Sequence, residues 1–196
     1  NPASAAFLPK QYFFSMAVFS PSRSYTITGT PTGYPGTFGL TPGTVESKSD
    51  VFPMPALAGN WKLDDASSLA VSFTAHGGMN TDYRTGTFYG GTHTGINLSQ
   101  AFLNTTYARK FGERHAFGVS GIFVVQQFEA QGLAAFGQFS HDAAKLTNNE
   151  TDTSTGFGFK AGYFGQLTDR FSVSLSYSPT IAMSQFDKYS GLFAED

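Results

Sequence analysis

The stretch from Phe171 to Ser184 reads F-S-V-S-L-S-Y-S-P-T-I-A-M-S, and it decides the fold that this sequence predicts. Apolar and ring residues alternate with serine, threonine and alanine, which is the period-two repeat of a β-strand with two different faces. The stretch exceeds the roughly 9–11 residues that a tilted strand needs to cross a bilayer. This is the pattern of an outer-membrane barrel strand, but a soluble β-sandwich can show the same alternation, so the repetition of the pattern along the chain decides between the two. The expected lipid-facing residues are Val173, Leu175 and Ile181, and the expected lumen-facing residues are Ser172, Ser174 and Ser176.

The composition fits a β-protein whose surface does not face water everywhere. Of 196 residues, 13% are charged and 16% are aromatic, with 21 Phe and 22 Gly. Few charges combined with many aromatic residues argue against disorder. The net charge of −2 implies no general attraction to nucleic acid or anionic surfaces. No apolar run reaches the about 18 residues of a transmembrane helix, and cysteine is absent.

Short polar turns alternate with long connections along the chain. The turns lie at 64–67, 112–115 and 167–170, and the connections, rich in Gly, Thr, Ser, Asn and Pro, lie at 21–44, 79–98 and 131–153. This asymmetry is typical of outer-membrane barrels, which have short periplasmic turns and long extracellular loops. With a first strand near 10–20, the pattern predicts seven strands. An open sheet of seven strands is not tolerated in lipid, so we expect them to belong to a larger barrel.

Four motifs occur in an order that resembles one protein family. They are N-P-A at 1–3, D-V-F-P-M-P-A-L-A-G-N-W-K-L-D-D at 50–65, H-G-G-M-N-T-D-Y at 76–83, and the segment 156–193 that contains D-R-F-S-V-S-L-S-Y. Together they resemble the end of the N-terminal hatch and strands two, three, six and seven of the FadL family. These are outer-membrane transporters of long-chain fatty acids and other hydrophobic molecules.

The resemblance implies an all-β fold, a monomeric antiparallel up-and-down barrel of fourteen strands plugged by a hatch. Residues 1–9 would end the hatch, and residues 10–196 would form the first half of the barrel. The implied function is passive uptake across the outer membrane of a Gram-negative bacterium, by loop capture, lumen binding and release through the hatch or a gap in the wall. It implies outer-membrane lipid and a fatty acid or aromatic hydrocarbon as partners, with no nucleic acid, no cofactor and no enzyme chemistry.

Gating residues are also implied by the resemblance. They are Asn1, Pro2 and Ala3 at the end of the hatch, and Gly77 and Gly78, which would lie at an inward kink of the third strand. A glycine pair in such a position has two interpretations, a plain strand end or a bulge that bends the strand.

Five residues are candidates for contact with a hydrophobic ligand. Leu133, Phe136 and Phe139 recur at helical spacing, which predicts an amphipathic helix within the connection 131–153. Its apolar face would either pack on neighbouring loops or help to form a capture groove. Phe52 and Met54 fall on the lumen parity of the second strand, where an apolar lining suits a hydrophobic cargo better than an aqueous pore.

The sequence offers poor enzyme and metal signals. Ser140, His141 and Asp142 are the three residue types of a hydrolase triad, but a triad is assembled from separate segments rather than from consecutive residues. The four histidines, at 76, 93, 115 and 141, lack the spacing of a metal site. We therefore expect no catalytic residue and no bound metal.

Two alternatives to a hydrophobic-compound transporter stay open at this point. A general porin would share the strand pattern without specific binding. A soluble extracellular β-sandwich for carbohydrate binding or adhesion would build its interior from the same alternating apolar residues. Trp61, Tyr107, Tyr163 and Tyr177 are candidates for the aromatic girdles that mark membrane interfaces in a barrel.

Overall fold

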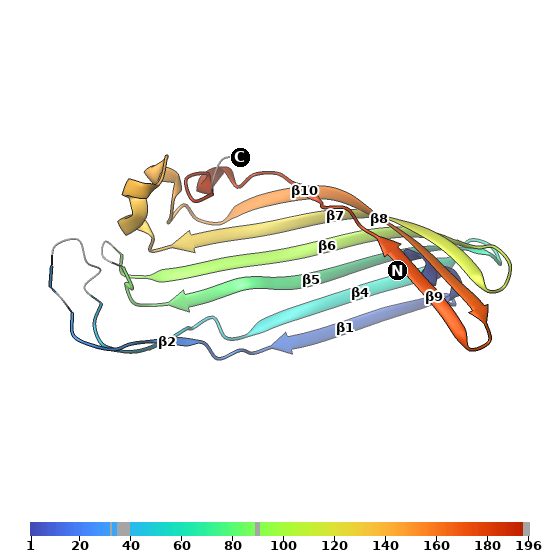
Figure 1. Cartoon of the computed structure of the whole chain (residues 1–196), viewed down its shortest axis with the longest axis horizontal. Helices are drawn as coiled ribbons and strands as arrows, with labels where there is room; N and C mark the ends of the chain where they lie inside the picture. The colour runs from blue at the N-terminus through green and yellow to red at the C-terminus, as the bar shows by residue number, and fades with distance from the viewer. Residues whose placement is uncertain (32, 35–39, 89–90, 194–196) are drawn as a thin grey trace.

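A computed structural model describes residues 1–31, 33–34, 40–88 and 91–193. Among these residues, one antiparallel sheet dominates (Figure 1). Its strands are β1 (Gln11–Phe19), β4 (Phe52–Lys62), β5 (Ser67–Tyr83), β6 (Thr94–Lys110), β7 (His115–Gln131), β8 (Asp152–Thr168), β9 (Phe171–Tyr177) and β10 (Ala182–Met183). They pair in the order β1-β4-β5-β6-β7-β8, and both β9 and β10 pair with β8.

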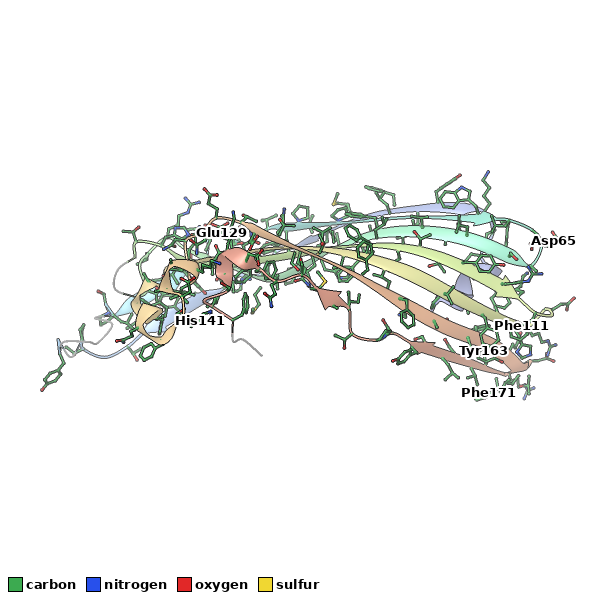
Figure 2. The ribbon with its side chains drawn as sticks, turned by 90° about the horizontal axis from the view of Figure 1, so that it is seen from above. Asp65, Phe111, Glu129, His141, Tyr163 and Phe171 are labelled. Carbon is green, nitrogen blue, oxygen red and sulfur yellow. The ribbon has the colours of Figure 1, made fainter. Side chains whose placement is uncertain are left out.

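The two ends of the sheet differ, as the sequence predicted. Residues 63–66, 111–114 and 169–170 make the short turns, which gather at one end in Figure 1. The opposite end carries the long connections and the separate hairpin of β2 (Ser24–Ile27) and β3 (Gly43–Glu46). We call these the turn end and the loop end. Figure 2 places Asp65, Phe111, Tyr163 and Phe171 at the turn end, and Glu129 and His141 at the loop end.

The two faces of the sheet also differ. The short 3-10 helix η1 (Pro2–Phe7) lies on one of them, which we call the inner face, where its alanines pack on Ala108 and Ala116. Register pairing carries this parity from strand to strand, so the inner face also bears Ser72, Asn104 and Ser120. The outer face is apolar, and its exposed residues include Leu57, Leu103, Phe117, Val119, Phe157, Phe159 and Leu175. This is the alternation expected of a lipid-facing wall.

The last strand is interrupted, unlike the continuous strand that the sequence predicted. Tyr177 pairs with Ala161 but Ala182 pairs with Phe157, so the β9–β10 side carries one extra residue between the two pairs. Pro179 lies in this interval and has no N–H for a ladder hydrogen bond. Because a one-residue offset exchanges the faces, Ile181 lies over Gly158 on the inner face. The expectation that Ile181 faces lipid with Val173 and Leu175 is therefore wrong.

Two connections differ in detail from the sequence-based expectation. The connection expected at 79–98 is shorter, because β5 continues to Tyr83 and β6 begins at Thr94. The connection at 131–153 contains two short 3-10 helices, η2 (Ala134–Phe139) and η3 (Ala143–Lys145), rather than one amphipathic helix.

Local hydrogen bonds explain the break between η2 and η3. The Ser140 hydroxyl donates to the carbonyl of Gly191 at 2.6 Å, and the Asp142 carboxylate accepts from the Ala144 N–H at 3.1 Å. Such side-chain bonds compete with helix continuation. A further 3-10 helix, η4 (Asp187–Tyr189), packs beside η3. None of the helices in the described part of the chain is long and apolar enough to cross a membrane.

Candidate functional site

The wall of the sheet has a gap between β4 and β5. β4 pairs with β1 from Phe52 to Asn60, but its pairing with β5 begins only at Ala56, opposite Thr74. Residues 52–55 of β4 are therefore not paired with residues 75–83 of β5. Pro53 and Pro55 lie in this part of β4, and since proline has no N–H to donate, the stretch is poorly suited to pairing on both edges.

β5 contains a bulge beside this gap. Gly77 pairs with Ser99 and Asn80 pairs with Asn97, so Gly78 and Met79 together oppose Leu98. A bulge of two residues against one bends its strand and increases the local twist. The strand continues through the glycines to Tyr83, so the interpretation of Gly77 and Gly78 as a strand end is wrong.

Gly78 is needed at the bulge for space rather than for its backbone conformation. Its φ is not among the positive values of the chain. A Cβ placed on Gly78 would lie 2.8 Å from the side chain of Leu98 and 2.9 Å from its carbonyl oxygen. Gly77, one residue earlier, has open space around the same position.

The gap and the bulge border a cleft of about 420 Å³, which we call the wall cleft. Its lining includes Phe52, Pro53 and Met54 of β4, Ala75 and Gly77 of β5, and Ala101 of β6. The structure thus brings together three residues that the sequence singled out for different reasons, namely Phe52, Met54 and Gly77. Ala75 and Ala101 are register partners on the outer face, so the cleft reaches the lipid-facing side of the wall.

Arg23 lies beside Phe52 of the wall cleft and was not identified from the sequence. Its guanidinium lies 5.3 Å from the ring centroid of Phe52 and donates a hydrogen bond to the carbonyl of Ser49. Its Nε is buried without a hydrogen-bond partner. A single arginine in a connection rich in glycine and threonine gives no periodic signal that could have marked it.

The N-terminal segment is fixed to the inner face near the turn end. The Asn1 side-chain amide donates to the carbonyls of Tyr163 (2.8 Å) and Leu175 (2.9 Å), and also lies 2.8 Å from Ser174 Oγ. Its Oδ1 accepts from the Ala3 N–H at 3.0 Å. The Asn1 side chain therefore bridges β8 and β9.

Two wall residues that the sequence did not single out hold the other end of the segment. Asn60 Nδ2 donates to the carbonyls of Leu8 and Pro9, both at 3.0 Å. Lys62 Nζ donates to the carbonyl of Ala6 at 2.6 Å. Both side chains face inward on β4. The only sign of this in the sequence is that Asn60 and Lys62 stand at alternate positions in step with Phe52 and Met54.

The expected gating residues do not form one site. Tyr163, which binds Asn1, pairs with Phe117, and Arg109 pairs with both Phe117 and Ser67. Gly77 lies ten residues beyond Ser67 along β5, which corresponds to about 30 Å of strand. The hatch-end triplet and the bulge are therefore in different parts of the wall.

The three apolar residues expected in the loop helix have different surroundings. Leu133 packs against the cluster of Phe128, Ala130 and Tyr189. The ring of Phe136 meets that of Phe88 edge to face, with centroids 4.9 Å apart. Phe139 remains 77% exposed, so it alone of the three presents most of its ring to the outside.

Tyr189 anchors the loops above β7 and β8. It is fully buried, and its hydroxyl donates to the carbonyl of Glu150 at 2.8 Å. Removal from water raises the pKa of the Tyr189 phenol above its ordinary value, which keeps it protonated as a donor. Glu150 itself has a positive φ of 58°, a conformation that non-glycine residues seldom adopt.

The polar groups that could suggest chemistry make contacts within the fold. Ser140 and Asp142 hold the loop helices in place, as described above. His76 lies beside Phe102, His93 Nε2 lies 2.7 Å from an Asp82 oxygen, and His115 Nδ1 lies 2.9 Å from the Tyr163 hydroxyl. Within the described residues, no group of three or more His, Cys, Asp or Glu side chains could hold a metal ion.

Comparison with known proteins extends these observations. A family model described as outer membrane protein transport protein (OMPP1/FadL/TodX) matches residues 1–195. No curated protein sequence matches the chain.

Solved structures of bacterial outer-membrane proteins share the fold. Two structures of the Pseudomonas putida toluene transporter TodX match with TM-scores of 0.63 and 0.66, each at 14% identity. They cover 92% and 93% of this chain, and 50% of the TodX chain in each case. A Pseudomonas aeruginosa FadL homologue matches with a TM-score of 0.52 and 18% identity, over 92% of this chain and 46% of its own. The chain thus spans about half the length of these structures.

Proposed function

This chain belongs to the OMPP1/FadL/TodX family of outer-membrane transport proteins of Gram-negative bacteria, and from that premise we propose that it provides the loop, wall and plug elements of a passive uptake route for hydrophobic molecules. The family consists of β-barrel transporters, not enzymes. In this proposal the sheet is part of such a barrel, and its exposed apolar outer face lies toward lipid while its inner face lies toward the lumen.

In the proposed route, a hydrophobic molecule is first held at the loop end, where Phe139 is exposed. It then enters the lumen, and it leaves sideways through the wall cleft. Residues 1–9 act as the end of the plug, and residues 10–196 form the first half of the barrel wall. The cargo we propose is a long-chain fatty acid or an aromatic hydrocarbon, the latter because TodX is a toluene transporter.

The observation that carries this proposal is the wall cleft itself. A lipid-embedded sheet loses several kcal/mol for each unsatisfied backbone group, so a gap is retained only where the surroundings tolerate it. Here the gap coincides with two prolines on one strand, a bulge on the other and an apolar lining from Phe52 and Met54. This combination suits the lateral passage of an apolar molecule.

Neither alternative function accounts for these features as well. A general porin needs no apolar lining, whereas Phe52, Met54 and the displaced Ile181 place apolar side chains on an inner face that elsewhere bears polar residues. A soluble sandwich needs two sheets packed face to face, whereas the long strands of the described residues form a single sheet with an exposed apolar outer face.

Deletion of Gly78 tests the lateral route in the full-length protein. The deletion removes the extra residue, so Gly77 and Asn80 return to one regular ladder with β6. A Gly78→Val substitution is less suitable because its Cβ would collide with the Leu98 carbonyl. We expect the deletion to abolish most uptake of radiolabelled oleate and toluene while heat-modifiable gel mobility, which reports barrel folding, stays normal.

Gly121→Ala is the control, because Gly121 lies on β7 outside the lining of the wall cleft and open space surrounds its Cβ position. It should transport at the wild-type rate. Wild-type uptake by a folded Gly78 deletion variant would instead assign the exit to the barrel axis.

A further inference from the structure

We propose that Gly118 and Gly162 form a seat without side chains that holds the segment Asn1–Ala3 against the wall and thereby sets how often the plug is released. This inference rests on the proposed function for its consequence in transport, but the seat itself is defined by contacts between wall and segment. Both glycines act as positioning residues for the plug.

The two glycines face the segment together. They are register partners on β7 and β8, and both are buried. A Cβ on Gly162 would lie closer than 3.0 Å to Asn1 Oδ1 and to Pro2 Cδ. A Cβ on Gly118 would lie closer than 3.0 Å to the backbone carbonyl of Pro2 and to the Ala3 nitrogen.

Space, not backbone conformation, explains glycine at these two positions. Neither Gly118 nor Gly162 belongs to the chain's positive-φ residues, so an L-amino acid could adopt their backbone angles. A side chain would not fit at Gly118, because the nearest atoms belong to the main chain of Pro2 and Ala3. Main-chain atoms cannot move aside by a change of rotamer. A single added methyl group would therefore move the segment rather than a flexible neighbour.

The surroundings of the seat are equally small and close-packed. Ala3, Ala5 and Ala6 of η1 meet Ala108 and Ala116 of the wall, and all five are buried. The segment is thus in contact with the wall almost at the level of the backbone, with little apolar area per residue. Burial of so little side-chain area contributes modestly to attachment, since the hydrophobic gain scales with area.

Hydrogen bonds from Asn1 provide the directional part of the attachment. Its Nδ2 lies within 2.9 Å of the carbonyls of Tyr163 and Leu175 and of Ser174 Oγ, yet an amide has only two N–H donors. The three acceptors therefore share two protons. These bonds form only when the segment lies close to Gly162, so the seat and the hydrogen bonds depend on each other.

Because side-chain burial is modest and the Asn1 hydrogen bonds need close approach, a small competing free energy can release Asn1–Ala3 from the wall. The glycine pair is the element that permits the close approach. We therefore expect Gly162→Ala and Gly118→Ala to favour the released segment, and we expect the barrel to fold normally because the register of β7 and β8 is unchanged.

Hydrogen–deuterium exchange of the peptide covering residues 1–9, in the folded full-length protein in detergent, measures the attachment directly. Gly162→Ala and Gly118→Ala should each speed exchange at the Ala3 and Ser4 amides on the order of tenfold or more, as overpacking of a close contact predicts. Gly121→Ala is the matched control, since Gly121 lies on the same strand β7 with open space around it. Its exchange should equal that of the wild type.

Asn1→Ala gives a second test that does not add volume to the wall. It removes the amide that bridges β8 and β9, and it should speed exchange of the same peptide to a similar extent. Gly162→Ala combined with Asn1→Ala should cost less than the sum of the two, because both act on one contact.

Uptake of radiolabelled oleate by cells distinguishes a failure of the proposed seat from a failure of the proposed transport function. The proposal requires faster uptake by the folded Gly162→Ala variant. Faster exchange with unchanged uptake would support the seat but contradict the role of the segment in transport. Unchanged exchange in both folded glycine variants would overturn the seat itself.

Discussion

The indole Nε1 of Trp61 donates a hydrogen bond to the hydroxyl of Tyr12 at 3.2 Å across the β1–β4 pair. The two rings meet edge to face with centroids 5.8 Å apart, and the indole covers Gly59 on the same strand. Farther along the same outer face of the sheet, Tyr163 bonds His115 and lies over Gly165. Both groups lie near the short turns, where amphipathic rings mark the membrane interface of a barrel.

Gly59→Ala should displace the Trp61 indole and destabilise the barrel. The new Cβ would lie 2.9 Å or less from two carbons of the ring. We expect a loss of roughly 1–3 kcal/mol, the usual cost of overpacking. Urea unfolding in lipid vesicles measures the loss of stability. The fluorescence of Trp61, taken as the difference between the spectra of the protein and of its Trp61→Phe variant, reports the surroundings of the indole. An unchanged spectrum and midpoint would show that the indole does not rest on Gly59.

The orientation of the wall can be tested with two adjacent residues in the middle of β6. Leu103 is exposed on the outer face, whereas Asn104 faces inward and donates to Ser72. Leu103→Arg should cost roughly 2–4 kcal/mol of folding free energy in bilayers, the penalty for a charge in hydrocarbon. Asn104→Arg should cost much less because the lumen side offers water. Equal penalties in the two variants would contradict the assignment of the faces.

The faces of the strands were predictable because a period of two is a local property of the sequence. The alternation along 171–177 and the three short turns identified the wall strands, and register pairing confirmed them. What local patterning could not predict is a change of register. The extra residue near Pro179 moves Ile181 inward, although the alternation of residue types continues past it unbroken. Only the position of the partner strand determines where such an offset occurs.

The candidate site was predictable in part for a similar reason. Phe52, Met54 and Gly77 were marked by parity and by resemblance, and they line one cleft. The contacts of Arg23 with Phe52 and of Lys62 with Ala6 join segments far apart in the chain. No spacing rule relates such residues. The distance between the N-terminal segment and the bulge likewise depends on how many residues of strand separate them. That number follows only from the strand register, which the sequence alone does not give.

The first short turn should make stability depend on pH. The Asp64 carboxylate accepts hydrogen bonds from the N–H groups of Ala66 (2.7 Å) and Ser67 (2.6 Å). These bonds, chiefly that from Ala66, lower the pKa of Asp64 below its ordinary value. A lowered folded-state pKa means that the stabilisation is present above the unfolded pKa of about 3.9 and is lost as the pH falls through the folded value.

Asp64→Asn should therefore destabilise the protein at neutral pH relative to the wild type, and the difference should shrink as the pH falls below about 3.9 and through the lowered folded-state pKa of Asp64. Urea unfolding of both proteins across this range is the measurement. Asp65→Asn, which removes a charge from the same turn (Figure 2), is the control and should behave like the wild type. A difference between Asp64→Asn and wild type that persists unchanged in acid would rule out the charged carboxylate as its source.

The last prediction concerns capture at the loop end. Of the three apolar residues expected there, Leu133 and Phe136 contact neighbouring side chains, so their substitution would disturb the loop as well as any ligand. Phe139 is the clean test because its ring is largely exposed and supports little of the fold. Exposed rings on a surface loop are where hydrophobic ligands gain contact area.

Phe139→Ser should lower oleate uptake at limiting concentration while surface expression and thermal stability stay unchanged. Loss of one buried ring from a ligand contact is worth roughly 1–3 kcal/mol, so uptake should fall about fivefold to a hundredfold. At saturating oleate the difference should narrow, because capture then no longer limits the rate. Gln138→Ser changes the exposed neighbouring residue without removing apolar area, and it should leave uptake unaltered. Equal uptake by the Phe139→Ser and Gln138→Ser variants at limiting oleate would show that this loop does not capture ligand.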